Sequence, residues 1–272
     1  MALSNSLVVK ITDDLPRHLI KNIHAYLGPL PSNEIERSSF IFTANKNTEN
    51  ALKALGYYRA VVTHSINKNF EKDLWTLSIK VLLNRPTTIK SVHISLTGEA
   101  LGDEAFKQII QNVPMISGDT LHHGIYEQFK TDLASLGLER GYFEGKFINS
   151  NIAIHKNLDS ADIIVHFDSG PRYKIGEIKF DDFTINASVL KPLIPFDKGD
   201  FYQQKSIQNL QNELDKTQYF SHVVVRPETE NSSRNVLPID VSLEKTKRHQ
   251  LNLGLGYATD TKERFSFGWK TP

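Results

Sequence analysis

The chain has 272 residues, 39% of them hydrophobic, so it is long enough for one large domain or for two to three small ones. The 32 basic and 31 acidic residues leave a formal net charge of +1, which gives no electrostatic case for nucleic acid or an anionic membrane as the main partner. The sequence has no cysteine, which excludes disulfides and thiolate metal sites. No stretch approaches the roughly 20 apolar residues that a transmembrane helix requires.

The first part of the chain predicts the order strand, helix, helix, strand, strand. The strands are expected at Leu7–Ile11, Tyr57–Ile66 and Trp75–Leu83, with a loop over Ser32–Phe42. The first helix follows a cap at Asp13 or Asp14, has Pro16 in its first turn and carries its apolar stripe over Leu19–Leu27, and the second runs from about Ala44 to Leu55. The last strand has the clearest alternation, because its apolar residues fall at every second position while Ser78 and Lys80 take the other face. The order closes at Asn84-Arg85-Pro86.

The same order then recurs twice. The second copy is expected as Ile89–Leu96, Leu101–Ile110, Leu121–Leu136, Tyr142–Ile154 and Ile163–Phe167, and the third begins with Tyr173–Phe180, Val189–Leu193 and Ile207–Leu214. Two further strands surround a polar turn near Glu230–Arg234. Such recurrence of one pattern indicates an internal repeat.

One motif marks each copy at the end of its second helix. The stretch ALKALGYY contains Gly56, and Gly141 of ERGYF follows 85 residues later, the same spacing that separates Pro86 from Pro171. The third copy has Gln218 at the corresponding place. Because Gly118 to Gly141 is one helical turn longer than Gly199 to Gln218, we expect the second copy's long helix to have one extra turn.

The last stretch, Gln250–Pro272, departs from the repeat. Apolar residues alternate with small or polar ones in LNLGLGY and again in RFSFGWK. This pattern is typical of lipid-facing and lumen-facing positions in a transmembrane β-barrel. A soluble hairpin with one buried face would give the same alternation, so both interpretations stay open on the pattern alone.

Several motifs together resemble a known family. The chain is similar to the polypeptide-transport-associated (POTRA) region of the Omp85 outer-membrane assembly proteins. The features that carry this resemblance are three β-α-α-β-β units, GYY and GYF after the second helix, SGPRYKIGEIKF at the start of the third unit and LNLGLGYATD near the end. Three units with ALKALGYY are most similar to the TamA-type members, the outer-membrane subunits of the translocation and assembly module. The resemblance covers the chain from about Leu7, with Gln218-Tyr219-Phe220 as a departure from its pattern.

The resemblance implies an α+β fold of three tandem β-α-α-β-β POTRA domains followed by a truncated β-hairpin from the start of an outer-membrane β-barrel. The expected boundaries are 7–84, 85–169 and 170–247 for the domains and 250–272 for the first barrel strands.

The resemblance also implies a location and partners. The chain would be the periplasmic part of a bacterial outer-membrane protein and a non-enzymatic scaffold for outer-membrane protein assembly or autotransporter translocation. The implied partners are a TamB-like inner-membrane-anchored periplasmic protein, unfolded outer-membrane protein clients and the chain's own barrel. No cofactor and no nucleic acid are expected.

The candidate binding site is an edge strand, because an extended partner can add to a free edge through main-chain hydrogen bonds. In the first unit we expect this strand over Tyr58–Ile66, with the alternating residues Tyr58, Ala60, Val62, His64 and Ile66. A second set of residues is expected at junctions between units or beside the barrel, namely Tyr57, Tyr142, Phe143, Tyr219, Lys245, Lys247 and Arg248.

No catalytic or metal-binding pattern stands out. His122 and His123 are adjacent, so on a helix they diverge by about 100° and do not form a metal pair as residues i and i+4 do. Gly254-Leu255-Gly256 has no third glycine and no following helix, which argues against a dinucleotide loop.

Three alternatives remain open. One is the periplasmic region of a two-partner-secretion transporter, and another is a soluble peptide-binding or RNA-binding repeat protein of the K-homology kind. The latter needs a GxxG loop beside basic residues, and the loops between the expected helices lack one. The third, a hydrolase or transferase, is disfavoured because no convergent acid, base or nucleophile is visible.

Overall fold

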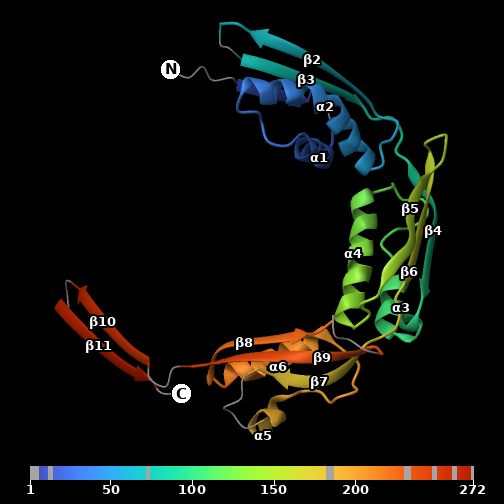
Figure 1. Cartoon of the computed structure of the whole chain (residues 1–272). Coiled ribbons are helices and arrows are strands. Elements are labelled where there is room, and N and C mark those ends of the chain that lie inside the picture. Colours follow the sequence, from blue (N-terminus) through green and yellow to red (C-terminus); the bar gives the residue numbers. More distant parts are fainter. Residues whose placement is uncertain are drawn as a thin grey trace. The chain divides into compact units, whose positions relative to one another are not determined.

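The computed structural model describes residues 6–11, 15–71, 74–181, 187–229, 234–246, 250–258 and 262–270. The fold is mixed α+β, with three three-stranded sheets and one two-stranded sheet among the described residues (Figure 1). Two compact units are distinguished: Met1–Leu96, Glu104–Leu133 and Phe147–Phe167 form the first, and Thr97–Asp103, Ala134–Lys146 and Asp168–Pro272 form the second.

The first sheet has the order β1 (Ser6–Ile11), β3 (Leu74–Leu82), β2 (Val61–Asn69). The central strand β3 runs parallel to β1 and antiparallel to β2. The helices α1 (Arg17–Leu27) and α2 (Glu34–Ala54) pack their apolar residues against this sheet. The core includes Ile23, Ala51, Leu52, Leu77 and Ile79, all inaccessible to solvent.

Two predicted starts of elements in this first repeat are wrong. Helix α2 begins at Glu34, ten residues before the expected start, because Asn33 caps it by accepting a hydrogen bond from the Glu36 N–H. The Glu36 carboxylate in turn accepts hydrogen bonds from the backbone and hydroxyl of Ser32. Strand β2 begins at Val61 rather than Tyr57, because the residues that follow Gly56 form turns.

The second sheet has the order β4 (Thr88–Thr97), β6 (Ser160–Asp168), β5 (Lys146–Ile154). Side-chain hydrogen bonds from Thr88, Ser91 and Thr97 of β4 reach Asp159, which directly precedes β6, and then Asp162 and Asp168 within it. The separation is 71 residues each time, so the two strands run parallel. The connection contains η1 (Glu99–Gly102), a single 3₁₀ turn, then α3 (Glu104–Gln111) and α4 (His123–Glu139).

The third sheet has the order β7 (Lys174–Phe180), β9 (Val236–Lys245), β8 (Phe220–Pro227). Its helical elements are α5 (Ala187–Leu190), the 3₁₀ turn η2 (Lys191–Leu193) and α6 (Gln204–Lys216). Helix α6 packs Ile207, Leu210 and Leu214 into the core. The predicted difference of one helical turn is confirmed, since α4 has 17 residues and α6 has 13.

Each three-stranded sheet places its third strand in the centre, between the first and the second in chain order. Three occurrences of one order agree with the internal repeat that the sequence predicts. The domain limits at 84/85, 169/170 and 247 remain predictions.

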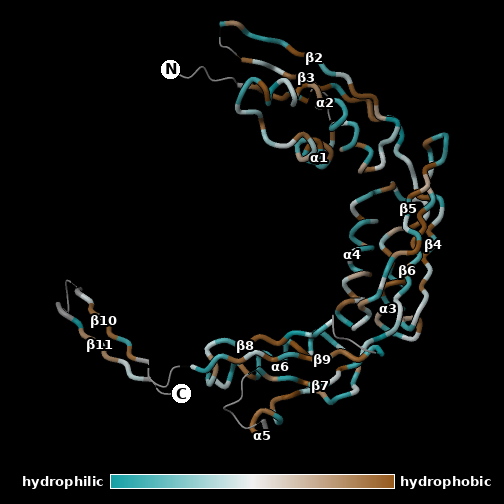
Figure 2. The backbone as a smooth tube through the Cα atoms, in the orientation of Figure 1, coloured by the Kyte–Doolittle hydropathy of each residue, from teal (hydrophilic) through white to brown (hydrophobic). Residues whose placement is uncertain are grey.

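The strands β10 (Gln250–Ala258) and β11 (Lys262–Lys270) form an antiparallel hairpin with nine residue pairs. Alternating hydrophobic and hydrophilic residues along both strands are visible in Figure 2. Three opposed pairs of large apolar side chains are exposed, namely Leu251 with Trp269, Leu253 with Phe267 and Leu255 with Phe265. Among the described helices, none combines the length and apolar character needed to span a membrane.

Candidate functional site

Strand β2 forms a free edge of the first sheet. All nine of its residues pair with β3 in one continuous register, and no described strand pairs with its other side. Such an edge presents a row of backbone N–H and C=O groups that another extended chain can use.

The side chains of β2 leave most of this strand open to solvent. Only Val62 is buried, and it belongs to the core of the first sheet. Val61 and Ile66 are 53% and 43% exposed. The Nδ1 atom of His64 lies 2.8 Å from Oδ1 of Asn45, which links the strand to α2.

The structure places three of the five predicted edge residues in β2. Val62, His64 and Ile66 alternate along the strand, whereas Tyr58 and Ala60 lie in the turns that precede it. Their predicted role in partner binding remains a prediction.

Helix α2 adds exposed apolar side chains beside this edge. Ile35 and Phe42 are 84% and 87% exposed and lie seven residues apart, which puts them on one face of the helix. Phe42 precedes Asn45, the partner of His64, by one helical turn. An extended chain along β2 would therefore meet apolar surface on the adjoining helix.

The far end of β2 carries a cluster of cations and aromatic rings. The guanidinium carbon of Arg37 lies 4.7 Å from the centre of the Trp75 ring, and the Lys68 ammonium lies 5.1 Å from the same ring. Lys68 also lies 5.1 Å from the Phe70 ring. Sequence reasoning missed this cluster, because Arg37 falls in the segment that was expected to be a loop.

The edge strand of the third sheet is less regular than β2. Strand β8 changes register between Phe220 and His222 and ends in Pro227. Irregular register and proline both hinder the addition of another strand. Of these two edges, β2 is therefore the better candidate for strand addition.

The turns after Gly56 contact the start of the second repeat. The carbonyl of Gly56 accepts a hydrogen bond from the Thr87 N–H at 2.8 Å, and the Thr87 carbonyl accepts one from the Leu121 N–H at 2.9 Å. The Tyr58 hydroxyl lies 2.5 Å from Nε2 of His123, and burial raises the pKa of Tyr58 and lowers that of His123.

An ion pair adds to this junction. The Arg59 guanidinium lies 2.7 Å from the Asp159 carboxylate and also donates to the carbonyl of Asn157. Tyr57, the other tyrosine of the motif, packs instead against the core of the first sheet.

The same backbone arrangement recurs after Gly141. Its carbonyl accepts a hydrogen bond from the Tyr173 N–H at 2.9 Å, and the Tyr173 carbonyl accepts one from the Tyr202 N–H at 2.9 Å. The Phe143 ring packs against Tyr173 and Tyr202, with ring centres 5.4 and 5.0 Å apart. Phe143 thus contacts the core of the third sheet.

A buried carboxylate lies beside this second junction. The Asp103 side chain is only 2% exposed and accepts hydrogen bonds from Nε of Arg140 at 2.7 Å and from the Tyr142 hydroxyl at 3.1 Å. Arg172 lies 3.7 Å from the same oxygen, and its own Nε donates to the Arg140 carbonyl. Burial and the Asp103 carboxylate raise the pKa of Tyr142 to about 12.

This raised pKa predicts a loss of stability in alkali. The folded chain favours the neutral phenol, so the contribution of Tyr142 is complete below its ordinary pKa of about 10 and is lost as the pH rises from about 10 to about 12. We expect the urea midpoint of Tyr142→Phe to fall less between about pH 9 and about pH 11 than the midpoint of the parent chain. Tyr219→Phe, at a residue 58% exposed, is the control and should decline as the parent chain does.

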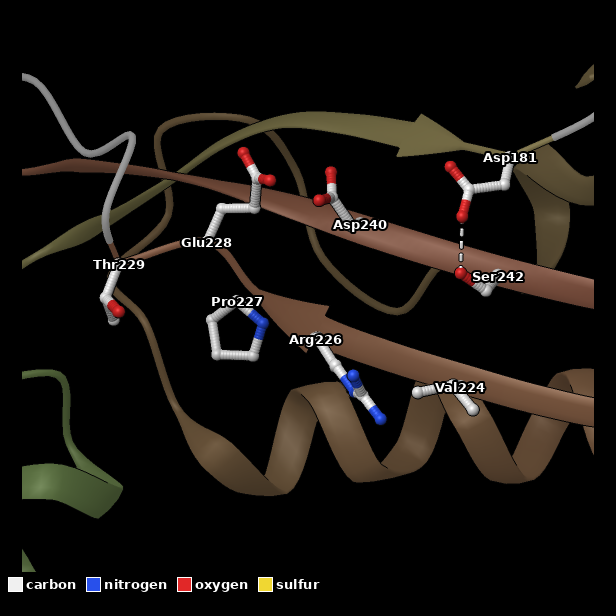
Figure 3. Close-up of a pocket in the computed structure, with 8 residues that line it drawn as sticks. All are labelled: Asp181, Val224, Arg226, Pro227, Glu228, Thr229, Asp240 and Ser242. Carbon is white, nitrogen blue, oxygen red and sulfur yellow. Dashed lines mark hydrogen bonds between the residues drawn. The ribbon is translucent and has the colours of Figure 1, made fainter.

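The third sheet carries a shallow hollow of about 440 Å³ (Figure 3). The carboxylates of Asp181, Glu228 and Asp240 line it, and burial, followed by the neighbouring Glu228, raises the pKa of Asp240. Asp181 accepts a hydrogen bond from Ser242, and Glu228 lies 3.7 Å from Lys179. In the part of the chain that the structure describes, no three His, Cys, Asp or Glu side chains, these carboxylates included, are arranged so that they could hold a metal ion.

The basic residues expected beside a barrel are only partly placed. Lys245 ends β9 opposite Phe220, and the Tyr219 carbonyl accepts a hydrogen bond from the Thr246 N–H. Lys247 and Arg248 lie outside the described residues.

Comparison with known proteins finds two family matches. Residues 9–82 match the family described as "POTRA domain TamA domain 1", and residues 173–246 match the POTRA family described as "Surface antigen variable number repeat". A curated relative, outer membrane protein assembly factor BamA of Buchnera aphidicola, is 24% identical over 149 residues, which are 53% of this chain and 24% of the relative. The chain thus spans about a quarter of that relative's length.

One of two similar solved structures shows a related fold. BamA from Haemophilus ducreyi lacking POTRA domains 1–3 is similar with a TM-score of 0.50 and 16% identity, over 67% of this chain and 34% of that one. POTRA domains 3–5 of Haemophilus influenzae BamA give a TM-score of 0.47 and 17% identity, over 88% of this chain and 95% of that one.

Proposed function

We propose, from the premise that this chain carries POTRA domains of an Omp85-family protein, that it is the periplasmic scaffold of an outer-membrane protein assembly or translocation machine. Its free edge strand β2 binds extended strands of partners or clients by β-augmentation. The single observation that supports this most is the edge of β2, which pairs continuously with β3 on one side and with no described strand on the other.

The chemistry of that edge fits a scaffold. Main-chain hydrogen bonds give affinity with little sequence preference, and exposed apolar residues such as Ile66 and Phe42 add contact area. A partner that alternates apolar and polar residues would satisfy both, because alternate side chains of an added strand face the helix side of the sheet. The proposed clients are accordingly unfolded outer-membrane proteins, whose strands alternate in this way.

The finer assignment is to the TamA-type members of the family. It is supported by the match of residues 9–82 to a family described as TamA domain 1. On this assignment the second repeat, with the same strand order as the other two, is also a POTRA domain. A TamB-like periplasmic protein is then the partner.

The hairpin β10–β11 is proposed as the start of an outer-membrane barrel. Its exposed apolar pairs, Leu251 with Trp269 and Leu253 with Phe267 among them, form the kind of surface that a barrel turns toward lipid.

Two neighbouring proline substitutions test the binding edge. In an antiparallel pair, successive residues direct their N–H groups to opposite sides of the strand. Of Ser65→Pro and Ile66→Pro, one therefore removes a donor to β3 and the other removes a donor from the free edge. The variant that lacks the donor to β3 should lose about 3 kcal/mol of stability. The variant that lacks the free-edge donor should stay folded and bind a partner strand about tenfold or more weakly, equivalent to about 1.4 kcal/mol.

The binding probe is a synthetic peptide that alternates apolar and polar residues. The same peptide with alternate backbone nitrogens methylated is the control, because it cannot complete the main-chain ladder. Affinity is measured by calorimetry and stability by thermal unfolding. Equal affinity of both folded proline variants and the parent chain for the unmodified peptide would show that β2 is not the binding edge.

A further inference from the structure

The side chain of Arg37 is buried without adequate partners. It is only 6% exposed, and its nearest acidic group is the Glu34 carboxylate at 3.6 Å, on a side chain 79% exposed. One terminal nitrogen, Nη1, has no accessible surface and no hydrogen-bond partner. A buried guanidinium with an unmade hydrogen bond is costly, so it indicates that an acceptor is missing.

A second unused donor lies against the same guanidinium. Nε1 of Trp75 is also buried and has no hydrogen-bond partner, and its ring centre lies 4.7 Å from the guanidinium carbon of Arg37. Two N–H donors from different elements, α2 and β3, therefore share one location. Tryptophan and arginine donate hydrogen bonds but do not accept them, so each requires an acceptor from elsewhere.

This location is next to the free edge. Trp75 is paired across the sheet with Lys68 of β2, whose ammonium lies 5.1 Å from the Trp75 ring. Lys68 thus lies between Trp75 and the side of β2 to which a partner strand adds. Arg37 and Lys68 place two cationic groups at this end of β2, and the Glu34 carboxylate that pairs with Arg37 at 3.6 Å is on a side chain 79% exposed.

We propose that Arg37, Trp75 and Lys68 form a binding site for a carboxylate of the strand that pairs with β2. A carboxylate has two coplanar acceptor oxygens, which match the fork of a guanidinium and leave capacity for the indole N–H. This site rests on the proposed function, because the strand that pairs with β2 brings the carboxylate to it.

Both donors lack accessible surface in the unbound chain, so a carboxylate reaches them only when neighbouring side chains move. Lys68 is one of these neighbours, with its ammonium 5.1 Å from the Trp75 ring at the end of a flexible side chain. The ammonium and the guanidinium then face the carboxylate together.

Two sources can supply the same chemistry. One is an Asp or Glu side chain within the bound strand. The other is the C-terminal carboxylate of the bound strand. Because the site lies near the C-terminal end of β2, a bound strand whose own C-terminus lies there runs parallel to β2.

The test measures the affinity of the full chain for three alternating peptides that differ only in charge. The first has one internal Asp and a free C-terminus, the second has an amidated C-terminus, and the third has Asn in place of Asp. Weaker binding of the second peptide by about tenfold assigns the site to a C-terminal carboxylate, and weaker binding of the third assigns it to a side chain. Equal binding of all three overturns the carboxylate site and leaves strand addition intact, whereas binding of none overturns the proposed function as well.

Variants at Arg37 identify the receiving group. Arg37→Met should bind the first peptide about tenfold more weakly. It should bind a fourth peptide, which has Asn in place of Asp and an amidated C-terminus, as the parent chain does. Its melting temperature should be unchanged or higher, because a buried and incompletely paired charge is removed. The control is Arg17→Met, at an exposed arginine that begins α1, and it should alter neither quantity. A lower melting temperature of Arg37→Met with equal loss of affinity for every peptide would show a purely structural role.

Discussion

Replacing Asp103 with alanine is expected to lower the free energy of unfolding by about 3–5 kcal/mol. The carboxylate is 2% exposed, and it holds together Arg140, Tyr142 and Arg172 through one oxygen. Its removal leaves two guanidinium groups beside each other, 28% and 13% exposed, without the charge that compensates them. Asp103→Asn should cost less, because the amide oxygen still accepts a hydrogen bond.

The effect is measured by urea denaturation followed by fluorescence, and the midpoints of the unfolding transitions are compared between variants. Glu104→Ala is the matched control, since Glu104 is the next residue and makes a solvent-exposed ion pair with Lys107 at 3.6 Å. Exposed pairs contribute about 0–1 kcal/mol, so this control should unfold close to the parent chain. Similar midpoints for Asp103→Ala and Glu104→Ala would contradict the role assigned to the buried carboxylate.

Replacing Gly56 with alanine is the second substitution with a large expected effect. Gly56 has a φ of 88°, and a Cβ atom there would lie 2.4 Å from the Leu121 carbonyl oxygen. The left-handed conformation costs a non-glycine residue about 1–2 kcal/mol, and the clash with backbone adds about 1–3 kcal/mol. We expect a total loss of about 2–5 kcal/mol together with disruption of the Thr87 hydrogen bond.

Gly118→Ala separates these two causes. Gly118 has a similar φ of 97°, but a Cβ atom there would meet nothing within 4 Å. It should therefore lose only the conformational part, about 1–2 kcal/mol. Thermal unfolding and amide hydrogen exchange at Thr87 measure the difference. If both variants lose equal stability and exchange at Thr87 is unaffected, the close approach of Leu121 has no energetic weight.

The sequence predicted the features that depend on periodicity and spacing. Alternation placed β3, and the spacing of Gly118 to Gly141 against that of Gly199 to Gln218 predicted the relative lengths of α4 and α6. Helix α2 was predicted too short, because its first half exposes Ile35 and Phe42 to solvent and so lacks a regular apolar stripe. A cap formed by Asn33 and Glu36, which is a local hydrogen-bonding device, determines its start instead.

The candidate sites were predictable only in part. A free edge follows from strand order, which the repeat and its family resemblance suggested before the structure placed β3 in the centre. The stacking of Arg37 on Trp75 joins residues from two elements whose relative position no spacing reveals. The same holds for Asp103 with Arg140, which are 37 residues apart.

The paired backbone contacts of Gly56 with Thr87 and of Gly141 with Tyr173 have a consequence for how such chains evolve and can be engineered. The main-chain part of each connection, which is made around a glycine, does not depend on the identity of the adjoining side chains. A gene segment that encodes one repeat could then be duplicated, deleted or exchanged in frame, and the new neighbours would meet through the same main-chain hydrogen bonds. The side-chain contacts at the same junctions, such as Arg59 with Asp159 and Phe143 with Tyr173, would still have to be matched in such chimeras.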